Sequence, residues 1–307
     1  MTQQLIDGDS RGVYVIAPTP FDDAGALDLE SAARMCEFYL GHGATGLTIL
    51  GIMGEAPKLT PAESLEFTRT VLKTVNNRIP VIVGVSSPAL NLMGSLSREV
   101  MELGAAGVMV APMPSLKTDS AIAGYYSAVM KELGDIPVCL QDYPQTLGVH
   151  FSTELLIRIF SEHPGICMLK HEDSPGLNKL SQFRAACDTT IGRRVSVLVG
   201  NGALFLPEEM ARGADGAMTE MLVQVVNLAT AGDTERAAEV FNAYLPMVRY
   251  ELQPGLGLAV RKYVLAQRGA IASAALRAPG PRLTDADRAE IKILWERQNK
   301  RLAELGL

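Results

Sequence analysis

The sequence predicts an α/β fold, a (β/α)8 TIM barrel with an appended C-terminal helical segment. Short apolar runs alternate with helical patterns at intervals of about thirty residues, the interval typical of βαβ units. Nearly every run is apolar throughout, as parallel strands covered on both faces must be. Eight such units in 307 residues favour a closed barrel over an open sheet. No G-x-G-x-x-G follows the first run, which removes the main support for a dinucleotide-binding fold.

Apolar runs beside Gly or Pro mark the predicted strands. These strands cover residues 12–18, 47–50, 80–85, 107–111, 137–140, 165–170, 195–200 and 216–219. Helical patterns follow at residues 28–40, from 60, at 91–103, 119–133, from 152, at 177–187 and at 205–212. The second helix has the clearest start, because Thr60 and Glu63 form a capping box with Pro61 at the first helical position.

The chain changes character at about Val223, beyond which helical patterns continue to the end. Breaks occur at Pro254 and at residues 279–281, and the last helix begins at about Thr284. This segment is longer than the one helix that an eighth unit requires. We therefore expect residues 1–222 to form the barrel. Residues 223–307 would supply its eighth helix and a helical extension packed on it.

Composition favours a soluble protein with a large core, since 48% of residues are hydrophobic and 20% are charged. A net charge of −6 gives no basic footprint for nucleic acid or an anionic membrane. Without a signal region or a membrane-length apolar stretch, we expect a cytoplasmic protein. The scattered cysteines and histidines predict no metal, and no cofactor is expected. Trp295 is interpreted as packing or an interface residue.

Lys170 is the main candidate for chemistry. It ends the apolar run 165–170, at the carboxyl end of a predicted strand, where active sites of barrels lie. Burial there disfavours the ammonium form and frees the amine to form a Schiff base with a carbonyl. The alternative is a lysine that only ends a strand and extends to water. The predicted barrel favours the reactive lysine, because it places the side chain over the opening.

Other residues follow the predicted strands at the same end of the barrel, and together with Lys170 they form the expected site. After the second strand, the candidates for substrate binding are Gly51, Ile52, Met53 and Gly54, and after the seventh they are Gly200 and Asn201. The catalytic candidates, besides Lys170, are Gln141, Tyr143 and Glu220.

These motifs resemble the dihydrodipicolinate synthase/N-acetylneuraminate lyase family of class I aldolase-like barrels. The matching features are the T-P-F-like run in residues 15–21, G-x-x-G-E at 51–55, L-T-x-x-E at 59–63, the lysine ending 165–170, and Gly200. The resemblance implies a homotetramer or homodimer that binds pyruvate or another 2-oxo acid as an imine on Lys170. It also implies that backbone N–H groups around Met53 hold the substrate carboxylate.

The sequence departs from this family where protons are transferred. The family's G-T-T-G-E loop has Ile52 and Met53 in place of its threonines, and Gln141 stands at the position of its relay tyrosine. A second relay tyrosine aligns with Pro114, and the arginine of the lysine-pathway synthase aligns with Thr146. We therefore reject that synthase and expect a Schiff-base-forming lyase, an aldolase or a hydro-lyase. The alternative is a catalytically silent barrel that binds a small oxo acid in a regulatory role.

Several residues could replace the missing relay. Gln141 cannot titrate and can only orient water or a carbonyl oxygen. Tyr143 would share its face if the strand continued, although a proline follows. Glu220 could be a general acid or base in the mouth, or only a salt-bridge or helix-terminal charge. Strand alternation points His171 away from the mouth and leaves Glu172 as a carboxylate that could act through its neighbours.

Overall fold

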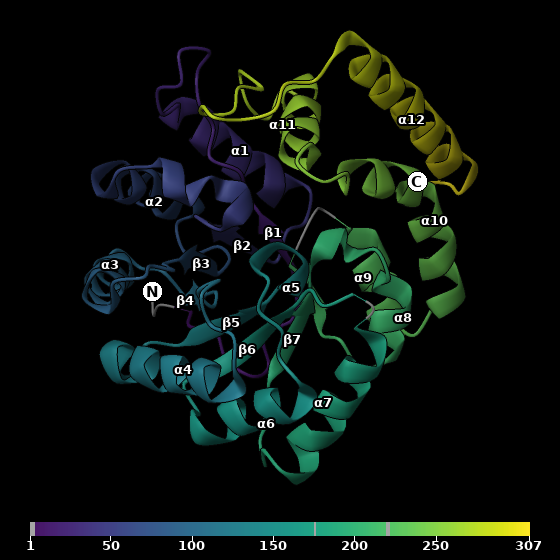
Figure 1. Cartoon of the computed structure of the whole chain (residues 1–307). Coiled ribbons are helices and arrows are strands. Elements are labelled where there is room, and N and C mark those ends of the chain that lie inside the picture. The colour runs from purple at the N-terminus through teal and green to yellow at the C-terminus, as the bar shows by residue number, and fades with distance from the viewer. Residues whose placement is uncertain (1–3, 175, 219–221) are drawn as a thin grey trace.

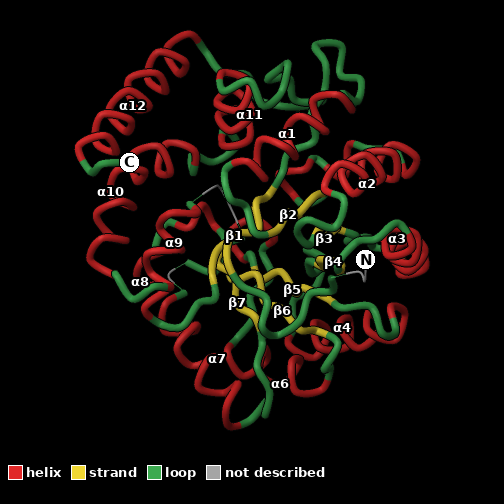
Figure 2. The backbone as a smooth tube through the Cα atoms, turned by 180° about the vertical axis from the view of Figure 1, so that it is seen from behind, coloured by secondary structure: helices red, strands yellow, loops and turns green. Residues whose placement is uncertain are grey.

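The computed structural model describes residues 4–174, 176–218 and 222–307. Within these ranges, eight parallel strands form a closed barrel in chain order, and β8 pairs with β1 (Figures 1 and 2). The predicted fold class is therefore confirmed. The strands are β1 Gly12–Ile16, β2 Gly46–Ile49, β3 Val81–Gly84, β4 Gly107–Val110, β5 Val138–Asp142, β6 Ile166–His171, β7 Ser196–Val199 and β8 Gly216–Ala217.

Helices surround this barrel on its outer side (Figure 2). They are α1 Leu29–Gly41, α2 Pro61–Val75, α3 Leu90–Glu102, α4 Asp119–Leu133, α5 Pro144–Leu147, α6 Thr153–Glu162, α7 Leu177–Thr189, α8 Leu206–Ala211 and α9 Val223–Thr230. Three 3-10 turns are η1 Ile52–Gly54, η2 Ala56–Lys58 and η3 Asn201–Ala203. The predicted capping box of α2 is confirmed, because Glu63 N–H donates to Thr60 Oγ1 at 3.2 Å and Thr60 N–H donates to Glu63 Oε2 at 2.8 Å.

Strand alternation divides the buried side chains into an outer core under the helices and an inner core in the lumen. The inner core consists of Ile6, Tyr14, Ile16, Ile82, Ala106, Met109, Cys139, Met168, Leu198 and Met218. The N-terminal segment closes the amino end of the lumen: Ile6 N–H donates to Ala106 O at 2.9 Å. Gly107 allows this approach, since a Cβ there would lie 2.6 Å from Ile6 Cδ1. Ser196 Oγ of β7 also donates to the N-terminal segment, at Ser10 O, with a distance of 2.7 Å.

The chain after the barrel forms α10 Thr234–Glu251, α11 Gly257–Gln267 and α12 Asp285–Glu304, which arch over one side of the molecule (Figure 1). In α9 and α10, Val225 and Phe241 join the outer core, whereas Val260 of α11 and Ile291 of α12 share a smaller core. The division at residue 222 stays a prediction. Among the described helices, none is long and apolar enough to span a bilayer.

Candidate active site

Lys170 and Gln141 lie side by side at the carboxyl end of the lumen. In β6, Met168 belongs to the inner core and Leu169 to the outer core, so alternation places Lys170 on the lumen side. In β5, Cys139 belongs to the inner core, and Gln141 follows two positions later. Gln141 pairs in register with Lys170. The barrel therefore brings together two of the catalytic residues that the sequence predicted.

Glu172 completes a buried cluster with these two residues. Its Oε2 atom lies 3.2 Å from Lys170 Nζ and accepts a hydrogen bond of 2.6 Å from Gln141 Nε2. The backbone N–H of Asn201 donates to the other carboxylate oxygen at 3.2 Å. Lys170 and Glu172 are each 5% exposed and Gln141 is 2% exposed. The nucleophile candidate therefore has a proton acceptor within hydrogen-bond reach, in a shielded place.

Local backbone pairing explains why Glu172 faces the lumen although β6 ends one residue earlier. Its N–H donates to Asp142 O at 2.9 Å, so the ladder with β5 and its alternation continue past His171. Gly200, after β7, leaves the room that Glu172 occupies, since a Cβ there would lie 2.3 Å from Glu172 Cγ. Gly200 and Asn201 thus support the carboxylate, and their role in substrate binding stays a prediction.

The loop after β2, whose residues 51–54 were predicted to bind substrate, lies over the lumen. Met53 packs against the inner core, and Gly51 lies over Met109, whose Cε would be 3.2 Å from a Cβ at that glycine. The hydroxyl of Thr19 holds the loop by donating to Gly54 O at 2.6 Å. The first N–H groups of a helical turn such as η1 have no acceptor within the turn. The loop is therefore suited to hold a carboxylate, and this role stays a prediction for Ile52 and its neighbours.

Glu55 anchors that loop to the C-terminal helices. It has a left-handed backbone with φ 53°, and its carboxylate lies 2.6 Å from Lys262 Nζ and 2.7 Å from Lys58 Nζ. Lys262 also donates to Ala275 O at 2.9 Å and lies 4.5 Å from the ring centroid of Phe21. Burial lowers the pKa of Lys262, and the hydrogen bond with Glu55 opposes this shift. All of these contacts fix the loop.

The structure places Tyr143 directly after the end of β5 and not within that strand. The alternation argument required β5 to continue through Tyr143, and this condition is not met, because β5 ends at Asp142 and Tyr143 lies at the N-cap position of the short helix α5 with φ −132° and ψ 70°. Burial raises the pKa of its phenol, a hydrogen bond with Thr146 opposes the rise, and the negative charge of Glu172 adds to it.

A second polar cluster lies behind the sheet, outside the lumen. His171 points there as predicted, with Nε2 3.1 Å from Gly176 O and Nδ1 3.8 Å from the carboxylate of Asp142. Lys179 of α7 lies 2.6 Å from Asp142 and 3.1 Å from Asp173. These charges tie the ends of β5 and β6 to α7, and none of them faces Lys170.

One predicted residue of the site is not described by the structure, and one residue of the lumen was not predicted. Glu220, a predicted acid or base, falls outside the described residues. Thr48 was not predicted, but its buried hydroxyl has no hydrogen-bond partner among the described residues. Its neighbours Leu47 and Ile49 belong to the outer core, so Thr48 faces the lumen. The signal was present in the sequence, as one polar residue within an apolar strand.

Comparison with known proteins agrees with this architecture. The model of one protein family, described as the Dihydrodipicolinate synthetase family, matches residues 9–298. The chain belongs to this family. An L-2-keto-3-deoxyarabonate dehydratase from Azospirillum brasilense is 31% identical over 94% of both chains. A 4-hydroxy-tetrahydrodipicolinate synthase 2 from Streptomyces coelicolor is 31% identical over 90% of this chain and 91% of its own.

A solved structure shares both fold and sequence with this member of the dihydrodipicolinate synthetase family. The crystal structure of dihydrodipicolinate synthase from Rhodopseudomonas palustris is 45% identical, with a TM-score of 0.93 over 96% of this chain and 99% of that one. The predicted resemblance is confirmed. Relatives with different names share this fold, so the activity of this member has to be argued from the groups around Lys170.

Proposed function

We propose that this protein is a Schiff-base-forming lyase acting on pyruvate or another 2-oxo acid, a hydro-lyase rather than the lysine-pathway synthase. The observation that carries the proposal is the contact of 3.2 Å between Lys170 Nζ and Glu172 inside the lumen. A silent barrel would need no proton acceptor beside its lysine. The likeness to a 2-keto-3-deoxyarabonate dehydratase supports a substrate that loses water.

Imine formation begins with the proton of Lys170. The ammonium transfers it to the Glu172 carboxylate across 3.2 Å, and the neutral amine adds to the C2 carbonyl of the oxo acid. The resulting carbinolamine takes the proton back from Glu172 on its hydroxyl and loses water. This step leaves a protonated imine on Lys170 beside a carboxylate of opposite charge, and the two charges attract strongly away from bulk water.

Elimination then uses the same carboxylate. In a 3-deoxy-2-oxo sugar acid, C3 carries hydrogen and C4 carries a hydroxyl. Glu172 takes a proton from C3, the C3–H electron pair forms the C2–C3 double bond, and the electrons of the C2–N double bond move to nitrogen to give an enamine. The enamine expels the C4 hydroxyl, which leaves as water with the proton from Glu172, and hydrolysis of the conjugated imine frees Lys170. One carboxylate therefore serves as base and acid, as a group at hydrogen-bond distance can.

Gln141 and Tyr143 have supporting roles in this proposal. The Gln141 amide donates to Glu172 Oε2 at 2.6 Å and thereby orients the carboxylate toward the lysine, without titrating itself. The phenol of Tyr143, which directly follows β5, is a second candidate for protonating the leaving hydroxyl. Residues 51–54 would hold the substrate carboxylate with backbone N–H groups.

Assembly and location belong to the same proposal. Family membership supports a homotetramer or a homodimer, and the composition supports a cytoplasmic protein.

Turnover of alternative substrates tests the function. We expect the purified protein to dehydrate L-2-keto-3-deoxyarabonate, detected by mass spectrometry as a product lighter than the substrate by one water. We expect no condensation of pyruvate with aspartate semialdehyde, because Thr146 stands where the synthase is expected to have its arginine. Condensation without dehydration would contradict the proposal. A Lys170→Ala control should lose turnover, whereas Lys179→Ala, behind the sheet, should retain it.

A further inference from the structure

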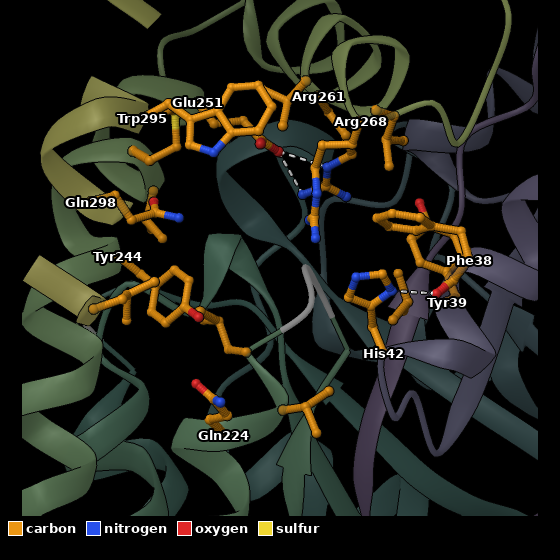
Figure 3. Close-up of a pocket in the computed structure, with 18 of the residues that line it drawn as sticks. Phe38, Tyr39, His42, Gln224, Tyr244, Glu251, Arg261, Arg268, Trp295 and Gln298 are labelled. Atoms are coloured by element: carbon orange, nitrogen blue, oxygen red, sulfur yellow. Dashed lines mark hydrogen bonds and ion pairs between the residues drawn. The ribbon is translucent and has the colours of Figure 1, made fainter. Parts of the chain in front are cut away.

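A second cavity lies away from the barrel lumen, between α1 and the C-terminal helices (Figure 3). Its volume is about 340 Å³, within the range of small-molecule sites. Residues from β1, α1, α9, α10, α11 and α12 line this cavity, whereas Lys170, Gln141 and Glu172 do not. We call it the C-terminal cleft. The lyase chemistry described above does not use it.

One positive charge in the C-terminal cleft has no counter-ion among the residues that the structure describes. Arg261 of α11 and Arg268, the residue directly after that helix, line the cleft, and Arg261 is neutralised by Glu251, with a distance of 2.7 Å between Nε and Oε1. The guanidinium of Arg268 lies 4.6 Å from the ring centroid of Phe38. Across the described ranges, no carboxylate forms an ion pair with Arg268. The stacked guanidinium is therefore a ready partner for an anion.

Two other polar side chains of the cleft can form further hydrogen bonds. His42 Nδ1 lies 2.7 Å from Phe38 O, and because a carbonyl only accepts, this nitrogen carries the proton and Nε2 remains for another partner. One buried amide atom of Gln298, Oε1, has no hydrogen-bond partner among the described residues. Figure 3 shows Gln298 across the cavity from His42 and Arg268. A ligand with a hydroxyl or amino group would satisfy the amide.

Aromatic side chains supply the remaining walls. Tyr39 of α1, Tyr244 of α10 and Trp295 of α12 line the cleft, and Figure 3 shows their rings around the same space. Flat faces of this kind favour a planar apolar group. The prediction that Trp295 serves in packing is thus incomplete, since its indole packs against the small C-terminal core and also borders the cavity.

We propose that the C-terminal cleft binds a small aromatic carboxylate that bears a hydroxyl or amino group. Its carboxylate pairs with Arg268, its ring lies among Tyr39, Tyr244 and Trp295, and its polar substituent contacts Gln298. The site is separate from the lumen and does not require the lyase activity. It gives the C-terminal helices, which the chemistry does not use, a ligand of their own.

Trp295 makes the proposal directly measurable, because it is the only tryptophan in the chain. We would titrate the full-length protein with 3-phenyllactate, follow the tryptophan emission and confirm binding by calorimetry. Saturable binding is expected, and the neutral primary amide of the same molecule should bind at least about tenfold more weakly. Lys170→Ala should bind 3-phenyllactate as the wild type does, which separates this site from the active site.

The variant Arg268→Gln should weaken 3-phenyllactate binding by about tenfold or more, since it keeps the side chain polar but removes the charge. The matched control is Arg158→Gln on α6, which removes an arginine from a surface pair with Glu162 and should leave binding unchanged. Circular dichroism would verify that both variants fold. No saturable binding, equal binding of the amide, or unchanged binding by Arg268→Gln would each overturn the proposal.

Discussion

Two buried lysines of this protein, Lys170 and Lys262, differ in how many partners hold them. Lys262 is 0% exposed and contacts Glu55 at 2.6 Å, Ala275 O at 2.9 Å and the ring of Phe21 at 4.5 Å. Lys170 is 5% exposed, and Glu172 at 3.2 Å is its only polar side-chain contact in the part of the chain that the structure describes. Both lysines pair with a glutamate, but only Lys170 has so few contacts that its amine can bind a further group.

A lowered pKa does not by itself make a buried lysine reactive. Burial lowers the pKa of Lys262, yet its amine is enclosed by partners and has no path to a substrate. Lys170 lies at the carboxyl end of the lumen, beside a carboxylate that can take its proton. A nucleophilic lysine therefore needs free space and a proton acceptor, and burial alone supplies neither.

The largest expected effect concerns the acceptor. Glu172→Gln keeps the shape that fits against Gly200 but cannot take a proton, so kcat should fall by about 10²–10⁴-fold with the fold intact. Steady-state dehydration assays would measure this loss. Asp173→Asn, behind the sheet, is the matched control and should retain activity. An unchanged kcat for Glu172→Gln would remove the carboxylate from the mechanism.

The next largest expected effect concerns Lys262, the lysine that is enclosed by its partners. Lys262→Met leaves Glu55 buried with one partner fewer, which should lower the free energy of unfolding by about 3 kcal/mol, measured by urea denaturation. Adding Glu55→Gln should recover part of this loss, because the uncompensated charge is then gone. A Lys262→Met variant as stable as the wild type would show that the contacts of Lys262 do not stabilise the fold, and would contradict the proposed contrast between the two lysines.

A third effect comes from Glu209 of α8, behind the sheet near His171. Burial raises the pKa of this carboxyl from 4.5 to about 7, the charge of His171 opposes the rise, and Glu208 adds to it. Between these values the folded protein binds more protons than the unfolded chain. Its stabilising contribution is complete below pH 4.5 and is lost as the pH rises through about 7.

We therefore expect the free energy of unfolding to fall by about 2 kcal/mol between about pH 5 and about pH 8 because of Glu209. Urea denaturation of Glu209→Gln should show this decrease removed, since the amide cannot ionise. Identical pH dependence in the variant and the wild type would contradict the assignment to Glu209.

The smallest expected effect tests the support of the reactive pair. In Gly200→Ala the added Cβ would lie 2.3 Å from Glu172 Cγ and must displace the carboxylate, so kcat should fall by about tenfold. The control is Gly124→Ala in α4, where nothing lies within 4 Å of the added atom. Equal kcat values for both variants would show that the position of Glu172 is not critical.

The sequence was sufficient for the barrel, because apolar runs and capping signals mark the strands and helices locally. It also placed Lys170 correctly, since β6 keeps its alternation up to that residue. At Tyr143 the sequence offered two signals, strand alternation and the proline that follows, and the structure agrees with the proline, since β5 ends at Asp142 and α5 begins at Pro144. The direct role of Glu172 depends on one further ladder bond, from its N–H to Asp142 O, that the pattern could not reveal.

The C-terminal cleft illustrates a different limit. Its walls come from β1 and α1 and from helices that begin at Val223 or later, so no local motif joins His42, Arg268 and Trp295. Each helix can be predicted from its own periodicity, but the angles at which helices pack depend on all of their surfaces together.

Borohydride reduction in the presence of pyruvate, followed by peptide mapping, tests the central claim most directly. We expect an irreversible pyruvate adduct on Lys170, none on Lys262, and none in a folded Lys170→Ala variant. An adduct on another lysine that persists in Lys170→Ala, or no adduct with pyruvate or any other 2-oxo acid, would contradict the assignment of Lys170 as the nucleophile.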